Sequence, residues 1–232
     1  MNKNKLLIIG GVLIIFVAGA AQFFSTRSAV SPIIPTATST PEQNVSTTTT
    51  TITVTTNVNT VPKNTAAHPL LFASGDNVAS WNFKGAYSDN PELMAKAQME
   101  IKRLSDLLTT ATSSAMILSV GIANQYELLG DGKKQYEYLG RAIQENPEHG
   151  LPWHNLGVLM EKLGAFKTAR ISYEKSTFVQ PELKFYHYAY IEFLTSRMKD
   201  DTVIVEKAFS AAEANFGNDS YLAYLRAEWQ KQ

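Results

Sequence analysis

The sequence contains no cysteine among its 232 residues. This absence excludes disulfide bonds, thiolate-ligated zinc, thiol catalysis and the lipid-modified cysteine of bacterial lipoproteins. The formal net charge is zero, and after Ser80 the chain carries 17 Lys and Arg against 19 Asp and Glu. A nucleic-acid-binding protein usually shows a basic cluster, and none stands out here, so we expect no nucleic-acid partner.

Motifs of common enzyme and cofactor sites are also missing. The chain holds no His-Glu-x-x-His, Gly-x-Ser-x-Gly, Gly-x-Gly-x-x-Gly or Walker pattern. Gly130-Asp131-Gly132-Lys133 matches only a fragment of a phosphate loop. His154 and His187 could form a metal pair if their helices stacked in parallel, but single histidines on helix faces are more often packed or solvated. We therefore predict no catalytic residue, no cofactor and no metal site. An enzyme acting on envelope glycans would need an acidic pair in a pocket, and no spacing indicates one.

A long apolar run occurs only at the start of the chain. Residues 6–24 read LLIIGGVLIIFVAGAAQFF, without a charge. A helix of this length spans about 28 Å at a rise of ~1.5 Å per residue, close to the thickness of a bilayer's hydrocarbon core. Lys3 and Lys5 precede the run and only Arg27 follows it, which predicts an uncleaved membrane anchor with a cytoplasmic N-terminus. The alternative is a signal peptide cleaved after Ala18-Gly19-Ala20, which would release a secreted protein.

A Ser/Thr-rich stretch follows the apolar run. Between Ser25 and Thr65, 19 of 41 residues are Ser or Thr, and prolines stand at 32, 35, 41 and 62. Such a composition cannot bury enough apolar surface to offset the entropy of ordering. We predict a disordered linker over residues 25–80, and a glycosylated spacer is the alternative.

Residues 81–232 show helical signals throughout. Asn90-Pro91-Glu92 has the order of a cap, a first-turn proline and an acidic residue, and apolar residues recur at helical spacing from Leu93 to Leu108. This predicts an all-α domain. Helices are expected at 90–109, 114–129, 132–145, 150–163, 166–178, 182–197, 201–216 and 219–230.

A period of 34 residues runs through this helical region. A shift of 34 aligns Pro147 with Pro181 and Gly130 with Gly164. The segment 153–181 resembles a tetratricopeptide repeat, because its residues match the signature of that family: Trp153, Leu156, Gly157, Ala169, Tyr173 and Pro181. The preceding copy keeps Ala123, Tyr126, Gly130, Ala142 and Pro147. A third, degenerate copy begins at Leu183, with His187 at the place of Trp153, and a closing helix with a polar end follows it.

The resemblance implies a solenoid of antiparallel helix pairs, a tetratricopeptide-like superhelix. A single helix pair cannot cover its own apolar face and must pack on its neighbours. We expect Gly157 to lie at such a helix contact, where its small size lets the helices approach and Tyr173 fills the space around it. Gly164 is expected to turn the chain between helices as a left-handed C-cap. Gly132, in the equivalent turn before it, is expected to matter less for packing unless its φ is positive.

In the tetratricopeptide family the first helix of each pair lines a concave groove that accepts a peptide or partner segment. Carried over by the repeat alignment, the groove would be lined by Asn124, Glu127, Leu128, His154, Val158, Glu161, Lys162, Phe185, Tyr188, Glu192 and Thr195. A clamp for a C-terminal carboxylate is not expected, because Val120, Val158, Tyr188 and Glu192 do not supply its cations and second amide. Together with the apolar run, the resemblance predicts a membrane-tethered scaffold that binds another protein outside the cytoplasm. The alternative is a soluble exported protein with the same binding module.

Overall fold

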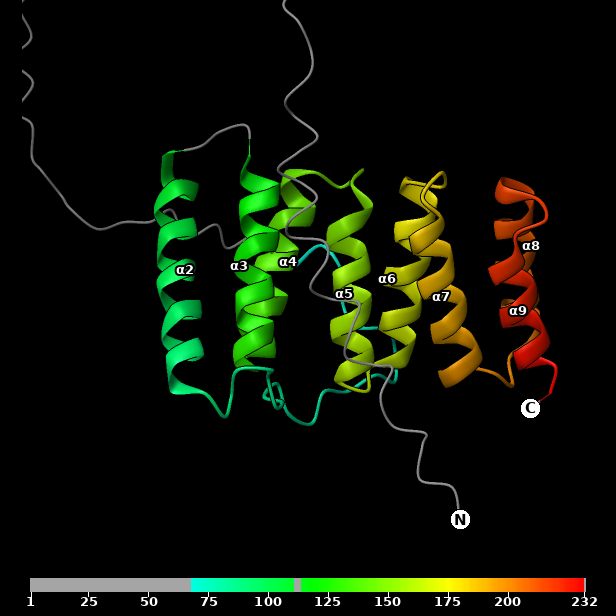
Figure 1. Ribbon diagram of the computed structural model, residues 1–232, viewed down its shortest axis with the longest axis horizontal. Coiled ribbons are helices and arrows are strands. Elements are labelled where there is room, and N and C mark those ends of the chain that lie inside the picture. The colour runs from blue at the N-terminus through cyan, green and yellow to red at the C-terminus, as the bar shows by residue number, and fades with distance from the viewer. Residues whose placement is uncertain (1–67, 111–113, 232) are drawn as a thin grey trace, which may run out of the picture. The chain divides into compact units, whose positions relative to one another are not determined.

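The structure is a computed structural model, and it describes residues 68–110 and 114–231 (Figure 1). The chain divides into two units, residues 1–60 and 61–232, and the described residues all belong to the second. The predicted anchor at residues 6–24 and the predicted linker up to residue 67 lie outside the described part. Among the helices that are described, none is long and apolar enough to cross a bilayer.

Residues 68–110 and 114–231 contain eight helices and no strand, which confirms the all-α prediction. The helices are α2 (Pro91–Thr110), α3 (Ala115–Leu129), α4 (Gly132–Glu145), α5 (Gly150–Lys162), α6 (Phe166–Val179), α7 (Lys184–Arg197), α8 (Thr202–Phe216) and α9 (Ser220–Trp229). Every helix begins and ends within two residues of its expected bounds.

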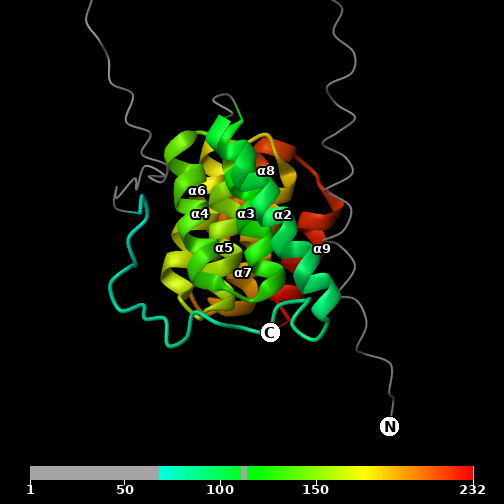
Figure 2. The ribbon, with the colours of Figure 1, turned by 90° about the vertical axis from the view of Figure 1, so that its left-hand side faces the viewer.

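Each helix packs on the next helix in chain order, from α2 to α9 (Figure 1). Helices α3, α5 and α7 are each followed by an antiparallel partner, and α5 also contacts α7, which in turn contacts α9. The helices α3, α5, α7 and α9 are called the first helices below. This packing is that expected of a helical solenoid. Viewed along the row of helices, α4 and α6 lie at the left edge, with α5 and α7 beside them nearer the centre (Figure 2).

One apolar core runs from α3 to α9, and its centre is closed to water. Leu156, Leu159, Ile191 and Phe209 belong to it, and none of these side chains is exposed. A smaller cluster of Leu104, Leu108 and Ile122 joins α2 to α3. This cluster, with Ile101, Leu118 and Tyr126 packed against it, holds α2 on α3 apart from the main core.

Equivalent contacts recur one repeat apart. Gly130 and Gly164 both have positive φ, 80° and 78°, as the C-cap prediction requires. Their backbone N–H groups donate to the carbonyls of Glu127 and Glu161, both at 3.0 Å. The turn between the helices of each pair is therefore closed in the same way in both copies.

The third copy keeps the hydrogen bond between its first helix and the preceding proline, although the tryptophan that makes it in the second copy is replaced. The Trp153 indole Nε1 donates to the Pro147 carbonyl at 2.8 Å. The His187 ring Nε2 lies 3.1 Å from the Pro181 carbonyl, and since a carbonyl only accepts, Nε2 carries the proton. Both contacts run from the first helix of a pair to the proline that ends the preceding unit, so histidine replaces tryptophan here without loss of the hydrogen bond.

Residues 68–87 form an ordered segment, the N-terminal clasp, that packs outside the helices. The Ala73 N–H donates to Thr168 Oγ1 at 3.0 Å, and the Tyr136 hydroxyl donates to the Leu70 carbonyl at 2.8 Å. The prediction of a disordered linker is therefore wrong for residues 68–80. Leu70, Val78, Trp81 and Phe83 pack against the main core, but their spacing has neither helical nor strand periodicity, so no pattern in the sequence indicates an ordered segment.

The clasp explains why the turn before α4 holds a second glycine. A Cβ at Gly132 would lie 2.6 Å from the Trp81 carbonyl oxygen and 3.1 Å from the Phe83 ring. The Gly132 N–H also donates to that carbonyl at 2.9 Å. Gly132 does not have positive φ, so its role is to let the clasp backbone approach the start of α4.

Gly132→Ala should destabilise the protein by about 1–3 kcal/mol, because the added methyl group meets backbone that cannot rotate away. The sequence predicts that Gly132 matters less than Gly157, and the structure adds a packing role for Gly132 that does not depend on positive φ. Urea denaturation of the purified chain measures the change, with Glu145→Ala on the exposed surface of α4 as the control. A Gly132→Ala midpoint equal to that of Glu145→Ala would mean that the clasp does not approach this turn.

Candidate functional site

An aromatic face lies on α7 and α9, the last two of the helices named first helices above. It consists of Phe185 and Tyr188 on α7 and Tyr221 and Tyr224 on α9. The Tyr188 and Tyr221 rings meet edge to face at 5.0 Å between centroids, and the Tyr221 and Tyr224 rings stack at 5.9 Å. Phe185 and Tyr188 are three residues apart on one helix and so lie on the same side of it. Phe185, Tyr221 and Tyr224 are 43%, 40% and 56% exposed, which is high for large rings.

Tyr221 and Tyr224 were not among the residues predicted from sequence. They follow Phe185 and Tyr188 by 36 residues instead of 34, so a fixed period misses them. The same pair of aromatic residues at a spacing of three in two successive first helices was the signal that could have identified them.

His154 is placed differently from the prediction, because it is only 7% exposed. Its ring centroid lies 4.7 Å from that of Phe185 and 5.6 Å from those of Tyr173 and Tyr186. Burial lowers the pKa of His154 to about 4, and its Nδ1 has no hydrogen-bond partner among the described residues. His154 is therefore a neutral core residue. Its ring packs against Phe185 and is too buried to contact another protein.

Glu127 and Asn124, the polar residues predicted on α3, both pair with side chains of α5, which are the predicted Lys162 and the unpredicted Asn155. Lys162 Nζ lies 2.7 Å from Glu127 Oε1, and the Asn155 side chain donates to Asn124 Oδ1 at 3.2 Å. The Lys162 ammonium also lies 4.5 Å from the centroid of the Phe83 ring in the clasp. These contacts join consecutive first helices, so the residues hold the repeats together at this end of the face.

The predicted carboxylates Glu161 on α5 and Glu192 on α7 are also paired within the chain. Glu161 accepts from the Tyr173 hydroxyl at 3.1 Å and from Arg197 Nε at 3.0 Å. Burial, with the nearby charge of Glu161, raises the pKa of Tyr173. Glu192 accepts from the Tyr221 hydroxyl, and this hydrogen bond raises the pKa of Tyr221 to about 12. Both tyrosines therefore remain neutral donors at physiological pH.

Asp219 connects α7 and α9, because it forms hydrogen bonds with groups of both helices. It caps α9 by accepting from the Tyr221 and Leu222 N–H groups at 2.9 and 3.1 Å. It also accepts from Lys184 Nζ at 2.7 Å and from the Tyr188 hydroxyl at 2.8 Å. These hydrogen bonds, with that from Lys184 the largest, lower the pKa of Asp219. The half-buried Tyr188 therefore holds the residue that caps α9, in addition to forming part of the aromatic face.

Of the remaining predicted residues, Val158 is half-buried against the core, and Thr195 is buried with its hydroxyl donating to the Ile191 carbonyl at 2.9 Å. Neither offers much surface to a partner. The predicted set thus divides into inter-repeat pairs, core residues and exposed rings. Glu161, Glu192 and Asp219 are already paired within the chain, so the exposed surface of this face is mainly aromatic.

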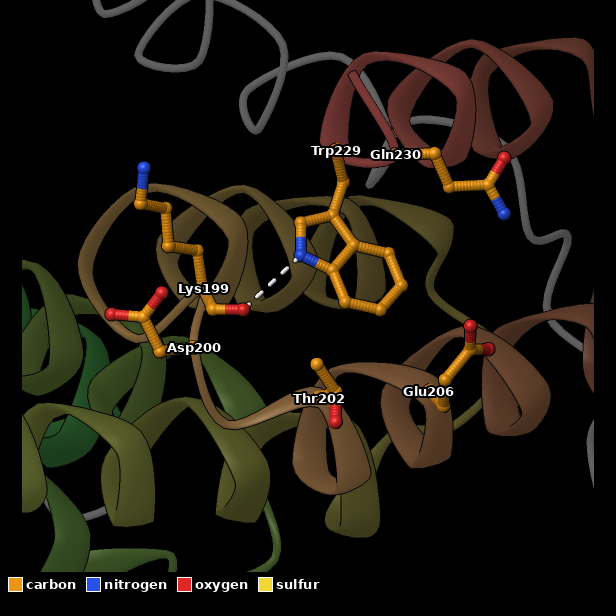
Figure 3. A pocket seen from close by; sticks show the side chains of 6 residues that line it. All are labelled: Lys199, Asp200, Thr202, Glu206, Trp229 and Gln230. Atoms are coloured by element: carbon orange, nitrogen blue, oxygen red, sulfur yellow. Dashed lines mark hydrogen bonds between the residues drawn. The ribbon is translucent and has the colours of Figure 1, made fainter. Parts of the chain in front are cut away.

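A shallow depression of about 540 Å³ lies beside the end of α9, the helix that also carries Tyr221 and Tyr224. Its lining comes from the α7–α8 connection, α8 and the end of α9: Lys199, Asp200, Thr202, Glu206, Trp229 and Gln230 (Figure 3). The Trp229 indole donates to the Lys199 carbonyl at 3.3 Å. Asp200 and Glu206 both line the depression, and Glu206 pairs with Arg226.

Within residues 68–110 and 114–231, no three His, Asp or Glu side chains gather in a way that could hold a metal ion. His187 lies against Phe216 at 5.1 Å and bonds to a carbonyl, while His154 lies among other rings, so the two histidines have separate surroundings. No protein-family model matches the chain, and no curated protein matches it.

Proposed function

We propose that the protein is a tetratricopeptide-like scaffold, tethered to a membrane through residues 6–24, that binds another protein outside the cytoplasm. The observation that carries the binding role is the aromatic face, where three large rings on adjacent first helices are at least 40% exposed. Exposed aromatic side chains that lie together on a soluble domain are typical of binding surfaces. The 34-residue period, the turn glycines at 130 and 164 and the Trp153–Pro147 and His187–Pro181 contacts support the family assignment.

The partner that suits this face is a peptide segment rich in apolar side chains. The tyrosine hydroxyls of residues 188 and 221 donate to Asp219 and Glu192, so the rings offer their faces and edges and not their polar tips. The neighbouring cations at 162, 184 and 197 are each bound to a carboxylate of the chain. A strongly charged partner would have to break these pairs, which disfavours it relative to an apolar one.

Phe185→Ala or Tyr224→Ala should each weaken partner binding by about 2 kcal/mol, roughly 30-fold, if these rings are hot spots. The partner would first be isolated by cross-linking and pulldown from membrane fractions, and its affinity for each purified variant would then be measured by calorimetry. These two positions are better probes than Tyr188, whose loss would also remove the hydrogen bond to the α9 cap.

The matched control is Phe178→Ala, since Phe178 is 74% exposed and lies on the second helix α6. Its loss should leave affinity unchanged. If Phe178→Ala abolishes binding while Phe185→Ala and Tyr224→Ala do not, the partner binds the second helices and the assignment of the face is wrong.

The second candidate is an exported protein with the same binding face, released by cleavage after Ala18-Gly19-Ala20. Carbonate extraction of membranes and the mass of the mature N-terminus distinguish the two. We expect the protein to remain with the membrane and to retain residues 6–24. A carbonate-soluble protein that begins near Ala21 would favour the exported form.

A further inference from the structure

Helix α6 lacks a capping side chain of its own. At the start of α4 the Asp131 side chain accepts from the Lys134 N–H at 2.9 Å. One repeat later the corresponding residue is Ala165, which provides no side-chain cap. The clasp supplies the missing group, because Asp76 accepts from the Thr168 N–H at 2.6 Å and from Thr168 Oγ1 at 2.7 Å. A carboxylate at this position also interacts favourably with the helix dipole.

The start of the clasp is attached to α4. The His68 ring stacks on Tyr136 at 3.6 Å between centroids, and its Nε2 lies 3.1 Å from the Tyr136 carbonyl. Gly140 makes room for this ring, since a Cβ there would lie 2.2 Å from His68. This end of the clasp is therefore held by one stacked pair, by hydrogen bonds in both directions and by a glycine whose absence of a side chain is needed for the fit.

The end of the clasp is attached to the turn between α3 and α4. The Phe83 N–H donates to the Gly130 carbonyl at 3.1 Å, and the Tyr87 N–H donates to the Leu128 carbonyl at 2.9 Å. Gly85 allows this approach, because a Cβ there would lie 2.2 Å from the Leu128 carbonyl oxygen. The clasp thus has three separate attachments, on α4, at the start of α6 and at the turn between α3 and α4. Its backbone passes beside α4 and α6 before the chain reaches α2 (Figure 2).

We propose that the clasp is a force-bearing fastening that transmits tension from the preceding chain to the central repeats and keeps it away from α2. The proposal rests on the proposed function in one respect, that the protein is held by its N-terminal side. Without the clasp, tension would enter at Pro91 and could peel α2 from α3 one turn at a time, against the Leu104–Leu108–Ile122 cluster and the side chains packed on it. With the clasp, tension entering at His68 is shared among several contacts on α4 and α6 that must fail together.

The absence of cysteine makes this testable on the full chain, since introduced cysteines are unique attachment points. Handles are attached at Ala67→Cys and Gln232→Cys, and single molecules are stretched with optical tweezers. We expect the otherwise unmodified chain to show no separate early step, because the clasp opens together with the repeats. In His68→Ala/Asp76→Ala the first part of the clasp should open early at low force, releasing the chain between residue 68 and the remaining attachment at Phe83, up to about 50 Å at ~3.6 Å per residue.

Asp106→Ala is the control, since it removes an exposed aspartate that pairs with Lys102 on the surface of α2. It should behave as the unmodified chain does. If the double variant does not fold, Asp76→Asn, which keeps the shape of the side chain, is stretched instead and should lower the force at which the clasp opens. An early step of the same length in the unmodified chain, or variants that change nothing, would overturn the proposal. The assay uses neither membrane nor partner, so its outcome is independent of the proposed binding role.

Discussion

Gly157→Leu should leave the repeat domain unfolded at temperatures where the unmodified chain is folded. A Cβ at Gly157 would lie 2.8–3.0 Å from three carbons of the Tyr173 ring. That ring cannot move aside, because its hydroxyl is bonded to Glu161 and its face packs on Phe193 at 5.1 Å between centroids. Overpacking typically costs about 1–3 kcal/mol, and the larger leucine side chain should exceed that range against a total stability of about 5–15 kcal/mol.

Thermal melts followed by circular dichroism test this prediction. The control is Gly121→Ala on α3, where the new Cβ would meet only the flexible end of Leu104, at 3.1 Å. We expect a small shift for Gly121→Ala and loss of the cooperative transition for Gly157→Leu. If both variants melt within a few degrees of the unmodified chain, Gly157 does not face a closely packed neighbour.

The second large effect is a loss of stability in acid that originates at His154. Its folded-state pKa of about 4 lies below the ordinary histidine value of 6.5, because burial opposes the charged form. The unfolded chain therefore binds a proton at His154 between these two values while the folded chain does not. Stability is fully present above pH 6.5 and falls as the pH approaches 4, by about 2–3 kcal/mol between pH 7.5 and pH 4.5.

The groups that face His154 do not titrate in this range. Tyr173 and Tyr186 pack against its ring, and burial raises the pKa of both. Burial also lowers the pKa of His68, His149 and His187, so they contribute in the same direction. His154→Phe isolates the contribution of this one residue by keeping a ring in the core.

Urea denaturation at pH 7.5 and pH 4.5 measures the effect for the unmodified chain and for His154→Phe. We expect His154→Phe to lose about 2–3 kcal/mol less than the unmodified chain between the two pH values. Equal losses would show that His154 can be protonated in the folded state and is more accessible than its burial indicates. His149→Phe serves as a control, because His149 lies half-buried at the start of α5 and its replacement should change the pH dependence less.

Features that depend on neighbouring residues in the chain could be predicted from the sequence. Apolar residues at helical spacing and local caps determine where a helix begins and ends, so all eight helices were placed to within two residues. Gly130 and Gly164 could be recognised as C-caps because positive φ at a helix end is a local requirement. Gly157 could be recognised as a packing residue because the resemblance to the tetratricopeptide repeat implies a small residue there, with Tyr173 filling the space around it.

Only the tertiary structure decided which of the residues predicted to line the groove are exposed. Glu127 and Lys162 are 35 residues apart and meet only because their helices stack, and His154 is buried because rings from two other helices close over it. Asp76 caps α6 across more than 90 residues of sequence, in a segment without periodicity. Such contacts are set by the distance between helices after packing, which no single segment contains. The sequence by itself therefore determined the helices and their order, and the packing determined which side chains are left for a partner.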